Sequence, residues 1–251
     1  MSRSGGPYGA GHGPGERRGY STNRGYDSSR SATNNRGFGE GRTLTESGQP
    51  ERGPRATRLT EDDVDALFAT IGKVRLVAFD FETTGLSAKA DRIVEIGAAA
   101  FRMEERDGTW IAIDEGSYET LINPRRPIPA VVSAIHGIDD LAVSSAPTFA
   151  QAAPEFLKFI EGSILVAHNA PFDLGFLEAE TTRAGLENPP NPAYDTISIA
   201  KTAVTGLPSY SLKSLAASFS IAQTAAHRGG DDARVCMELF IRCINLINTS
   251  R

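Results

Sequence analysis

The sequence predicts an α/β fold in which helices flank a mixed β-sheet, and two observations carry this prediction. Three apolar, strand-like stretches at 75–82, 91–102 and 110–122 follow one another before any comparable helical pattern interrupts them. After them, a helical pattern at 147–160 is followed by a short apolar strand at 163–168 and by further helices. Consecutive strands followed by alternating helices and strands are typical of a mixed sheet with helices packed on its faces.

The folded part is expected to begin with a helix. Thr60 precedes three acidic residues, which together form a helix-capping signal. Apolar residues then recur at the helical spacing i, i+3, i+4 and i+7 from Val64 to Ile71, and Gly72 ends the helix. The apolar run 75–82 is the first strand, and Asp107-Gly108 predicts a hairpin turn between the second and third strands.

The second half of the sequence predicts helices that are separated by one short strand. Pro154 lies inside the first of these helices and is expected to break or kink it, because proline has no amide hydrogen to donate. Cys236 and Cys243 share one face of the last helix, which predicts buried free thiols. The predicted elements of this half are the helix 147–160, the strand 163–168, and the helices 171–185, 211–219 and 231–248.

Charge and composition divide the 251-residue chain near residue 58. The first 58 residues hold ten Arg, no Lys, five acidic residues and 13 of the 25 Gly, with hardly any Leu, Ile or Val. Such a segment has too little apolar surface to offset the entropy of ordering. We therefore predict a disordered Gly/Arg-rich tail at 1–58 and one domain at 59–251, which carries 16 basic and 26 acidic residues.

Hydropathy and the number of cysteines exclude several classes of protein. No apolar run approaches the 18 residues of a transmembrane helix, and the first residues lack the apolar core of a signal peptide. Two cysteines cannot build a disulfide framework. We therefore expect a cytoplasmic protein that does not bind membranes. The Arg-Gly pairs and aromatic residues of the tail suit loose contact with nucleic acid, and a solubilising tail is the alternative.

Two carboxylates occur where a core strand has no structural use for them. Asp80 and Glu82 lie in the first predicted strand, and because strand side chains alternate, both project from the same face about 7 Å apart. Two like charges on one face of a core strand repel each other and resist ionisation. A cation between them would remove this penalty, and oxygen ligands favour Mg²⁺ or Mn²⁺. A solvated surface strand is the alternative.

Two further acidic positions lie at the starts of predicted helices. Asp173 falls in the first turn of its helix, where the helix dipole favours the ionised carboxylate, and helix capping is the alternative role. His227 precedes Asp232 by five residues, across Gly229-Gly230, which we interpret as a flexible elbow. Histidine titrates near neutral pH and is therefore suited to removing a proton from water. The alternative is that Asp231 and Asp232 are ordinary helix-start acids.

Four segments of the chain resemble, in order, the motifs of the DEDDh 3′–5′ exonucleases. The resemblance spans about residues 70–248 and is strongest to the DnaQ-like group, which includes the proofreading epsilon subunit of bacterial DNA polymerase III. It implies a ribonuclease-H-like fold and metal-dependent hydrolysis of phosphodiester bonds. The matching segments are 79–86 with 92–98 for the first motif, 123–138 for the connecting segment, 168–173 for the second motif and 227–232 for the third.

The resemblance also implies a role for each matching residue. Asp80, Glu82, Asp173 and Asp232 would hold two divalent metal ions, Mg²⁺ or Mn²⁺, and His227 would act as the general base, which makes five catalytic residues. Nucleoside 5′-monophosphates would leave one at a time from a 3′ end. The residues implied to contact the terminal nucleotides are Thr83, Thr84, Gly85, Leu86, His136, Asn169 and Phe172.

Some of these implied contacts have structural alternatives. Leu86 would wedge between the last two bases and Phe172 would stack on a base, but either residue is alternatively part of the core. Gly85 alternatively supplies a turn position with positive φ. His136 has no such alternative at this point, because a loop histidine has no evident role in a core.

The substrate and the setting of the enzyme are open to more than one interpretation. DNA, with single strands favoured, is the first expectation, and trimming of RNA is the alternative. A polymerase-accessory or nucleic-acid-binding module is an alternative of a different class. The chain ends at Arg251, three residues after its last predicted helix, without the C-terminal extension through which the epsilon subunit joins its polymerase. We therefore expect a free-standing exonuclease with at most a weak contact to a DNA polymerase.

Overall fold

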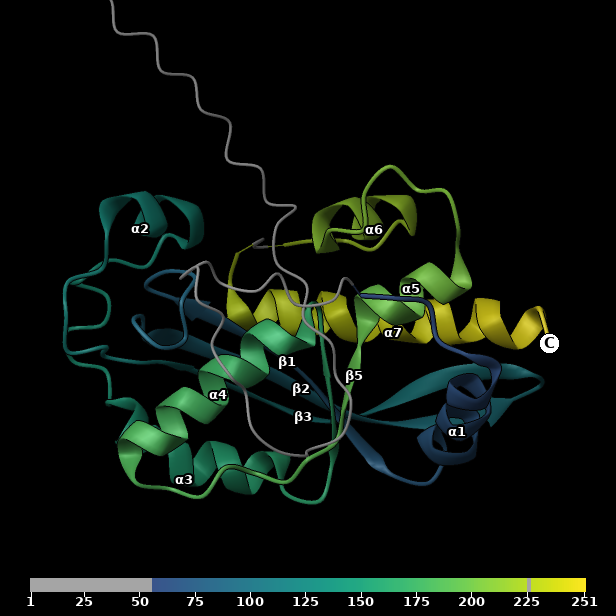
Figure 1. Cartoon of the computed structure of the whole chain (residues 1–251), viewed down its shortest axis with the longest axis horizontal. Helices are drawn as coiled ribbons and strands as arrows, with labels where there is room; N and C mark the ends of the chain where they lie inside the picture. Colours follow the sequence, from purple (N-terminus) through teal and green to yellow (C-terminus); the bar gives the residue numbers. More distant parts are fainter. Residues whose placement is uncertain (1–55, 225–226) are drawn as a thin grey trace, which may run out of the picture. The chain divides into compact units, whose positions relative to one another are not determined.

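The computed structural model describes residues 56–224 and 227–251, so most of the predicted tail lies outside the described residues. A five-stranded sheet in the order β3-β2-β1-β4-β5 forms the centre of the domain (Figure 1). The first three strands along the chain pair antiparallel, and the last two are parallel to β1. The predicted mixed sheet is confirmed. The strands are β1 (Arg75–Thr83), β2 (Ile93–Arg106), β3 (Thr109–Leu121), β4 (Ile164–Ala167) and β5 (Ala193–Asp195).

Helices cover both faces of the sheet, and each face has its own apolar core. On one face, α1 (Glu61–Ile71), α5 (Thr196–Ala203), α6 (Leu212–Ser218) and α7 (Gly229–Thr249) contribute buried residues to a common cluster. On the other face, α3 (Phe149–Ile160) and α4 (Ala170–Ala184) contribute to a second cluster. The short helix α2 (Ala130–His136) lies beyond one end of the strands (Figure 1).

The alternation of side chains along β1 determines where its two acids lie. Leu76 and Ala78 belong to the cluster under α7, whereas Val77, Phe79 and Phe81 belong to the cluster under α3 and α4. Asp80 and Glu82 continue the first series, because successive side chains of a strand point to opposite faces. The two carboxylates therefore occupy the face of the sheet that α7 covers, at the C-terminal end of β1.

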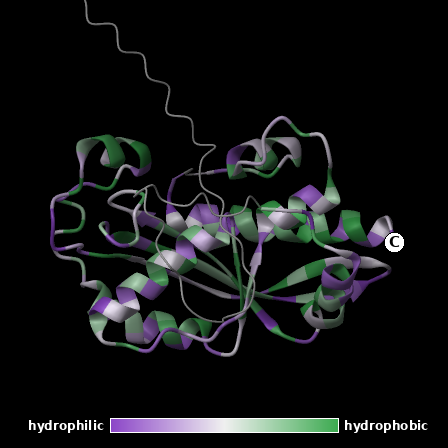
Figure 2. Cartoon of the chain, in the orientation of Figure 1, coloured by the Kyte–Doolittle hydropathy of each residue, from purple (hydrophilic) through white to green (hydrophobic). Residues whose placement is uncertain are grey.

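Several local predictions are confirmed in detail. Thr60 and Asp63 form a capping box at α1, in which the amide of Asp63 donates to Thr60 Oγ1 over 3.1 Å. Asp107 and Gly108 adopt positive φ in the hairpin between β2 and β3, as a tight hairpin turn requires. Both cysteines are free and buried in α7. The alternation of hydrophobic and hydrophilic residues along α7 is visible in Figure 2.

Other expectations are wrong. Pro154 does not break its helix, because α3 continues through it from Phe149 to Ile160, where Phe149, Phe156 and Ile160 are buried and a capping box secures the start. The glycines Gly229-Gly230 are not an elbow, because they form the first turn of α7. Three short elements with little periodicity, α2, β5 and α5, were not predicted from the sequence. In the described part of the chain, no helix is both long and apolar enough to cross a bilayer.

Candidate active site

One hydrogen bond brings the first and second motifs together. The amide of Phe81, between Asp80 and Glu82 on β1, donates to Asp173 Oδ1 over 3.1 Å. Asp173 lies in the first turn of α4, as expected, and only 2% of its surface is exposed. Its carboxylate thus bonds to the neighbouring strand, which places it beside the two acids of β1 and argues against a role limited to helix capping.

The start of α7 reaches the same place because of glycines. A Cβ atom added to Gly97 on β2 would lie 1.9 Å from the carbonyl carbon of Gly229, so this approach requires glycine at position 97, and a Cβ on Gly229 would be tight at 3.0 Å from the Gly97 amide nitrogen. Asp232 follows in the first turn of α7 and is 8% exposed. The neighbouring Asp231 instead accepts hydrogen bonds from the amide and hydroxyl of Thr224, over 2.9 and 2.8 Å. Asp231 is therefore a structural acid, and Asp232 is the one that joins the site.

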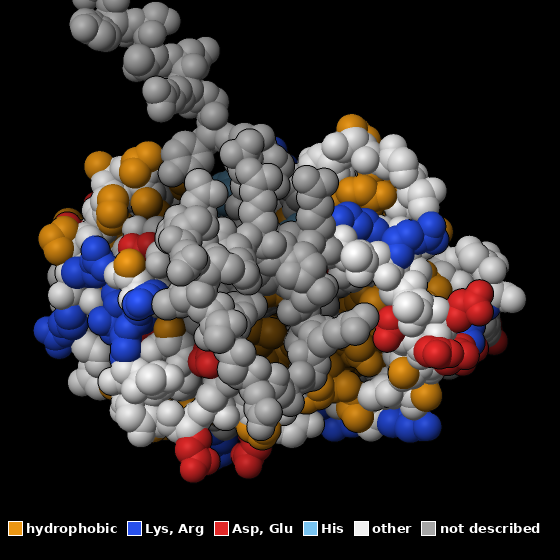
Figure 3. Space-filling model, in the orientation of Figure 1, with side chains coloured by type: hydrophobic (Ala, Val, Ile, Leu, Met, Phe, Trp, Pro, Cys, Tyr) orange, Lys and Arg blue, Asp and Glu red, His pale blue; other side chains and the backbone are white. Residues whose placement is uncertain are grey.

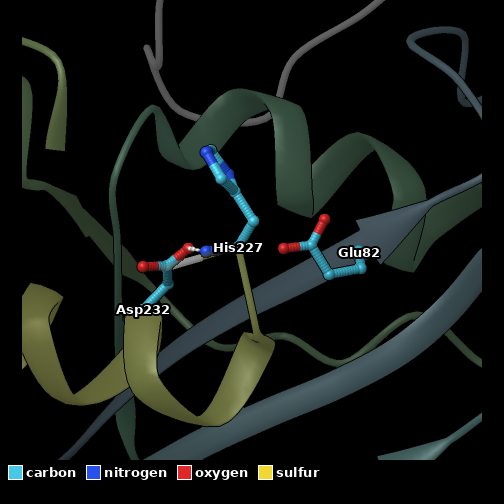
Figure 4. A group of neighbouring side chains, drawn as sticks. All are labelled: Glu82, His227 and Asp232. Atoms are coloured by element: carbon cyan, nitrogen blue, oxygen red, sulfur yellow. Dashed lines mark hydrogen bonds between the residues drawn. The ribbon is translucent and has the colours of Figure 1, made fainter. Parts of the chain in front are cut away.

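His227 lies in the turn immediately before α7 and is exposed. Its backbone has φ of 63°, and its amide donates to Asp232 Oδ2 over 3.0 Å. Figure 4 shows this bond and three side chains: His227 from the turn before α7, Asp232 from α7 and Glu82 from β1. One potential ligand atom from each of these three residues lies within 4.8 Å of the other two. The structure thus brings the predicted base next to two of the predicted ligands.

The carboxylates are held where ionisation is unfavourable. Burial raises the pKa of Asp80 well above its usual range, and the nearby charges of Asp173, Glu82 and Asp232 raise it further. Burial also raises the pKa of Asp173, although the Phe81 amide favours its ionised form. Burial and the mutual repulsion of like charges thus both favour the protonated forms of these two carboxyl groups.

The remaining two carboxylates follow the same pattern. Burial raises the pKa of Glu82 to about 7, with smaller contributions from Asp232 and Glu95, against which Arg228 acts. Burial raises the pKa of Asp232 as well, and the His227 amide opposes that shift. Oxygen donors that repel one another in a partly closed site suit a hard divalent cation, which would stabilise all of their ionised forms.

A fifth carboxylate, which was not predicted from the sequence, lies at this site. Glu95 on β2 is fully buried and accepts hydrogen bonds from the guanidinium of Arg228 and from the amide of Gly229. The signal was present, because Glu95 interrupts an apolar strand in the same way as Asp80 does. A second missed acid, Asp195, accepts a hydrogen bond from the amide of Asn169 over 3.0 Å and thereby holds the second motif in place.

The turn after β1 contains four of the residues expected to contact substrate. Thr83 Oγ1 donates to the Gly85 carbonyl over 2.6 Å, and Thr84 is buried with its hydroxyl directed at Asp91. Gly85 does not need positive φ. A Cβ at this position would lie 2.5 Å from an oxygen of the Asp91 carboxylate, so the Asp91 side chain would have to move to accommodate another residue. Leu86 is 74% exposed, so the alternative of a core residue is wrong.

The other three expected contacts lie on different elements. His136 is the last residue of α2, not a loop residue. It is 3% exposed, and its Nδ1 accepts the amide of Ile138 over 3.0 Å. Asn169 adopts the left-handed conformation just before α4. Phe172 is half-buried and packs on Phe176, with the ring centroids 5.0 Å apart.

The pKa and the surroundings of His136 place it close to the site. Burial lowers the pKa of His136, and the charges of Glu95, His227 and Arg228 also act on it. Figure 3 shows apolar side chains gathered on the surface over α2, where Val131 and Ile135 are exposed. The histidine is therefore close to the acidic cluster, at the end of a helix that exposes apolar side chains.

A mixed sheet of this order that is flanked by helices, with a cluster of acids at the C-terminal end of β1, has the ribonuclease-H-like fold. The family model described as Exonuclease (RNase_T) matches residues 77–240. DNA polymerase III subunit epsilon of Treponema pallidum (strain Nichols) is 44% identical over 182 residues, which cover 72% of this chain and 81% of that protein. The chain belongs to the DnaQ-like family of 3′–5′ exonucleases.

Other similar proteins are larger than this chain. The PolC-type DNA polymerase III of Caldanaerobacter subterraneus subsp. tengcongensis is 36% identical over 168 residues, which cover 67% of this chain and 11% of that protein. A crystal structure of E. coli Exonuclease I in complex with a dT13 oligonucleotide aligns with a TM-score of 0.57 at 18% identity, over 70% of this chain and 41% of that one. At this identity the structural match establishes the fold alone, which is the ribonuclease-H-like fold that the sequence predicts.

Proposed function

We propose that the domain is a DEDDh-type 3′–5′ exonuclease that degrades single-stranded DNA and releases nucleoside 5′-monophosphates. The observation that carries the proposal is the convergence of four carboxylates from β1, α4 and α7, with an exposed histidine beside them. DNA is favoured over RNA because the relatives named above are DNA polymerase III proteins and the Exonuclease I structure contains a DNA oligonucleotide.

The donor set supports two divalent cations, Mg²⁺ or Mn²⁺, as cofactors. The four acids Asp80, Glu82, Asp173 and Asp232 all have a raised pKa, and the nearby cation Arg228 is engaged by Glu95. Carboxylate oxygens are the donors that these cations prefer. When bound, such ions would stabilise the charge that develops on the scissile phosphate and would lower the pKa of a water molecule.

His227 supplies the proton acceptor in this proposal. Its imidazole takes a proton from the water molecule that attacks the phosphorus of the last phosphodiester bond. The bond from this phosphorus to the 3′ oxygen of the penultimate nucleotide breaks, and that oxygen acquires a proton from solvent. The exposure of His227 and its proximity to Glu82 and Asp232 support this role. Removal of a proton by a positioned histidine typically accelerates a reaction about 10²- to 10⁴-fold.

The residues around the cluster would hold the terminal nucleotides. The turn from Thr83 to Leu86 presents backbone groups and one exposed apolar side chain next to Glu82. Phe172 in the first turn of α4, His136 at the end of α2 and Asn169 just before α4 would contact base, sugar or phosphate. All five proposed catalytic residues come from one chain, which supports hydrolysis without a polymerase partner and leaves a polymerase contact as an addition to the activity.

A labelled-oligonucleotide assay tests the proposal. Single-stranded DNA and RNA of one sequence, labelled at either the 5′ or the 3′ end, are incubated with Mg²⁺, Mn²⁺ or EDTA. We expect 3′-labelled DNA to release labelled mononucleotide at once, 5′-labelled DNA to shorten stepwise, and EDTA to stop both reactions. Faster degradation of RNA would favour the RNA-trimming alternative, and digestion from the 5′ end would refute the proposal.

A variant pair separates the chemistry from the fold. Replacing Asp80 with Ala should abolish hydrolysis while circular dichroism and the cooperative unfolding transition persist. The control is Asp62→Ala, which removes an exposed acid of α1 and should leave the rate unchanged. Substantial metal-dependent hydrolysis by Asp80→Ala would contradict the assignment. Size-exclusion chromatography with a DNA polymerase tests for a stable complex, and none is expected.

A further inference from the structure

The buried acid Glu95 has no place among the proposed metal ligands. It lies directly opposite Glu82 in the antiparallel pairing of β1 and β2, and none of its surface is exposed. Like charges at opposite positions of a strand pair destabilise the sheet unless another group compensates them. A buried carboxylate also requires hydrogen-bond donors. The groups that satisfy Glu95 therefore indicate what it does.

Both oxygens of Glu95 are bonded to the segment that begins α7. Arg228 donates from Nη2 to Oε1 over 2.7 Å and from Nε to Oε1 and Oε2 over 3.1 and 3.3 Å. The amide of Gly229 donates to Oε2 over 2.8 Å. Charge-assisted bonds of this kind are about twice as strong as neutral ones. Arg228 and Gly229 thus engage both oxygens of Glu95, which lies beside the cluster formed by the other four acids.

These bonds hold the two residues that directly follow His227. On its other side, the amide of His227 itself donates to Asp232. His227 also has φ of 63°, a conformation that is unfavourable for a residue other than glycine and persists only where neighbouring contacts impose it. Glu95 and Asp232 provide those contacts from β2 and from α7.

We propose that Glu95 is a positioning residue, which acts through Arg228 and Gly229 to hold the imidazole of His227 beside the reacting phosphate. This inference rests on the proposed function, because it presupposes that His227 removes the proton from water. Glu95 touches neither substrate nor metal in this role. Its loss would displace the base, and a displacement of about 1 Å in an active site can cost a hundredfold in rate.

The first test measures kcat and KM with single-stranded DNA for Glu95→Gln and Arg228→Ala. Each substitution should lower kcat roughly ten- to a hundredfold and change KM by less than about twofold, because the ligands and the turn after β1 remain intact. Arg228→Lys should recover part of the lost rate, since it restores the charge but not the fork of donors. Arg228 is partly exposed, so its variants remain informative even if Glu95→Gln does not fold.

The decisive test repeats Glu95→Gln in a His227→Ala background under single-turnover conditions. If Glu95 acts through His227, the double variant should be no slower than His227→Ala alone. If Glu95→Gln lowered the rate in that background by the same factor as in the unsubstituted protein, Glu95 would have a general structural role. That result would overturn the inference, while the role of His227 would stand. Full activity of both Glu95→Gln and Arg228→Ala would also overturn it. Unchanged activity of His227→Ala would instead refute the proposed base, and this inference with it.

Glu119 provides a matched control. Its carboxylate lies 3.7 Å from the same Arg228 guanidinium, but from β3 and with 54% of its side chain exposed. An exposed pair of this kind contributes little. Glu119→Gln should therefore change kcat by less than about twofold, and a loss comparable to that of Glu95→Gln would contradict the role assigned to the buried acid.

Discussion

Gly97 on β2 and Gly229 at the start of α7 touch through their backbones. A Cβ on Gly97 would lie 1.9 Å from the carbonyl carbon and 2.1 Å from the carbonyl oxygen of Gly229. A Cβ on Gly229 would in turn lie 3.0 Å from the Gly97 amide nitrogen. This contact sets the distance of α7 from the sheet, and that distance determines whether Asp232 reaches the acids of β1.

We predict that Gly97→Ala impairs both stability and activity. The added methyl group must push α7 away from β2, because the atoms it meets belong to the backbone and cannot rotate aside. Overpacking of a core costs about 1–3 kcal/mol, and here it also displaces Asp232. The free energy of unfolding in urea should fall by at least that amount, and hydrolysis should fall by more than tenfold.

Gly175 in α4 offers the matched control for that substitution. A Cβ there would meet only the Cβ of Ala88, at an ordinary contact distance of 3.9 Å. Because alanine is the better helix former, Gly175→Ala should raise the free energy of unfolding by about 0.5–1 kcal/mol. A Gly97→Ala protein as stable and active as the Gly175→Ala protein would show that α7 does not need the close contact.

The pKa of Glu82 predicts how the stability of the metal-free protein depends on pH. Its pKa is raised from the ordinary value of 4.5 to about 7 in the folded state. Between these values the folded state binds more protons than the unfolded state, so stability decreases as the pH rises. The effect of this single group is on the order of 3 kcal/mol.

Urea unfolding in EDTA at pH 5 and pH 8 measures this dependence. Glu82→Gln should reduce the difference between the two pH values by the part that this group contributes, since Asp80, Asp173 and Asp232 also have a raised pKa, and it should be more stable than the unsubstituted protein at pH 8. Added Mg²⁺ should stabilise the unsubstituted protein more at pH 8 than at pH 5, because protonated carboxylates bind metals weakly. If Glu82→Gln were less stable at pH 8, the carboxylate would not carry an ionisation penalty.

The pKa of His168 predicts that the stability of the protein depends on pH with the opposite sign. Burial lowers its pKa from the ordinary value of 6.5 to about 4, and its Nδ1 lies 2.9 Å from Thr196 Oγ1. Between these pKa values the unfolded state binds the extra proton, so stability decreases as the pH falls from 6.5 to 4, by about 3 kcal/mol in total. The variant His168→Asn retains a partner for Thr196 and should lose this slope. Parallel stability curves for the two proteins over that pH range would refute the prediction.

Replacing the exposed Leu86 should weaken the interaction with substrate without lowering the stability of the protein. Its side chain is 74% exposed beside the turn that follows Glu82. Leu86→Ala should change the free energy of unfolding by less than about 0.5 kcal/mol. If the side chain packs against a base, kcat/KM for single-stranded DNA should fall roughly five- to thirtyfold, which corresponds to about 1–2 kcal/mol.

The control for Leu86 is Leu246→Ala, which truncates a partly exposed leucine near the far end of α7. Its kcat/KM should remain unchanged. Equal kcat/KM values for the two variants would mean that Leu86 does not touch the substrate.

Much of the site could be predicted from the sequence because its residues break strong local patterns. Asp80 and Glu82 stand out in an apolar strand, and the period of two places them on one face without any knowledge of the fold. Their meeting with Asp173 and Asp232 depends on the topology of the sheet, and only the resemblance to a family indicated it. The structure then supplied the contacts, such as the bond from Phe81 to Asp173.

What sequence reasoning missed depends on tertiary contacts. Glycine in Gly229-Gly230 permits either flexibility or close packing, and only the presence of Gly97 opposite it decides between them. Glu95 was visible as an acid in an apolar strand, but its partner Arg228 is 133 positions away. The helix α5 has only eight residues, and its start is fixed by Asp195, which bonds to the amide of Ile197.

The separation of the site's residues along the chain has a consequence for biosynthesis. Asp80, Glu82 and Glu95 are made early, whereas His227 and Asp232 are made only with the last helix of the described domain. On the proposed assignment, a growing chain holds part of the metal site but neither the base nor the fourth carboxylate. Cleavage can therefore begin only after α7 has packed onto the sheet, so the enzyme stays inert toward nucleic acids around it while it is being translated.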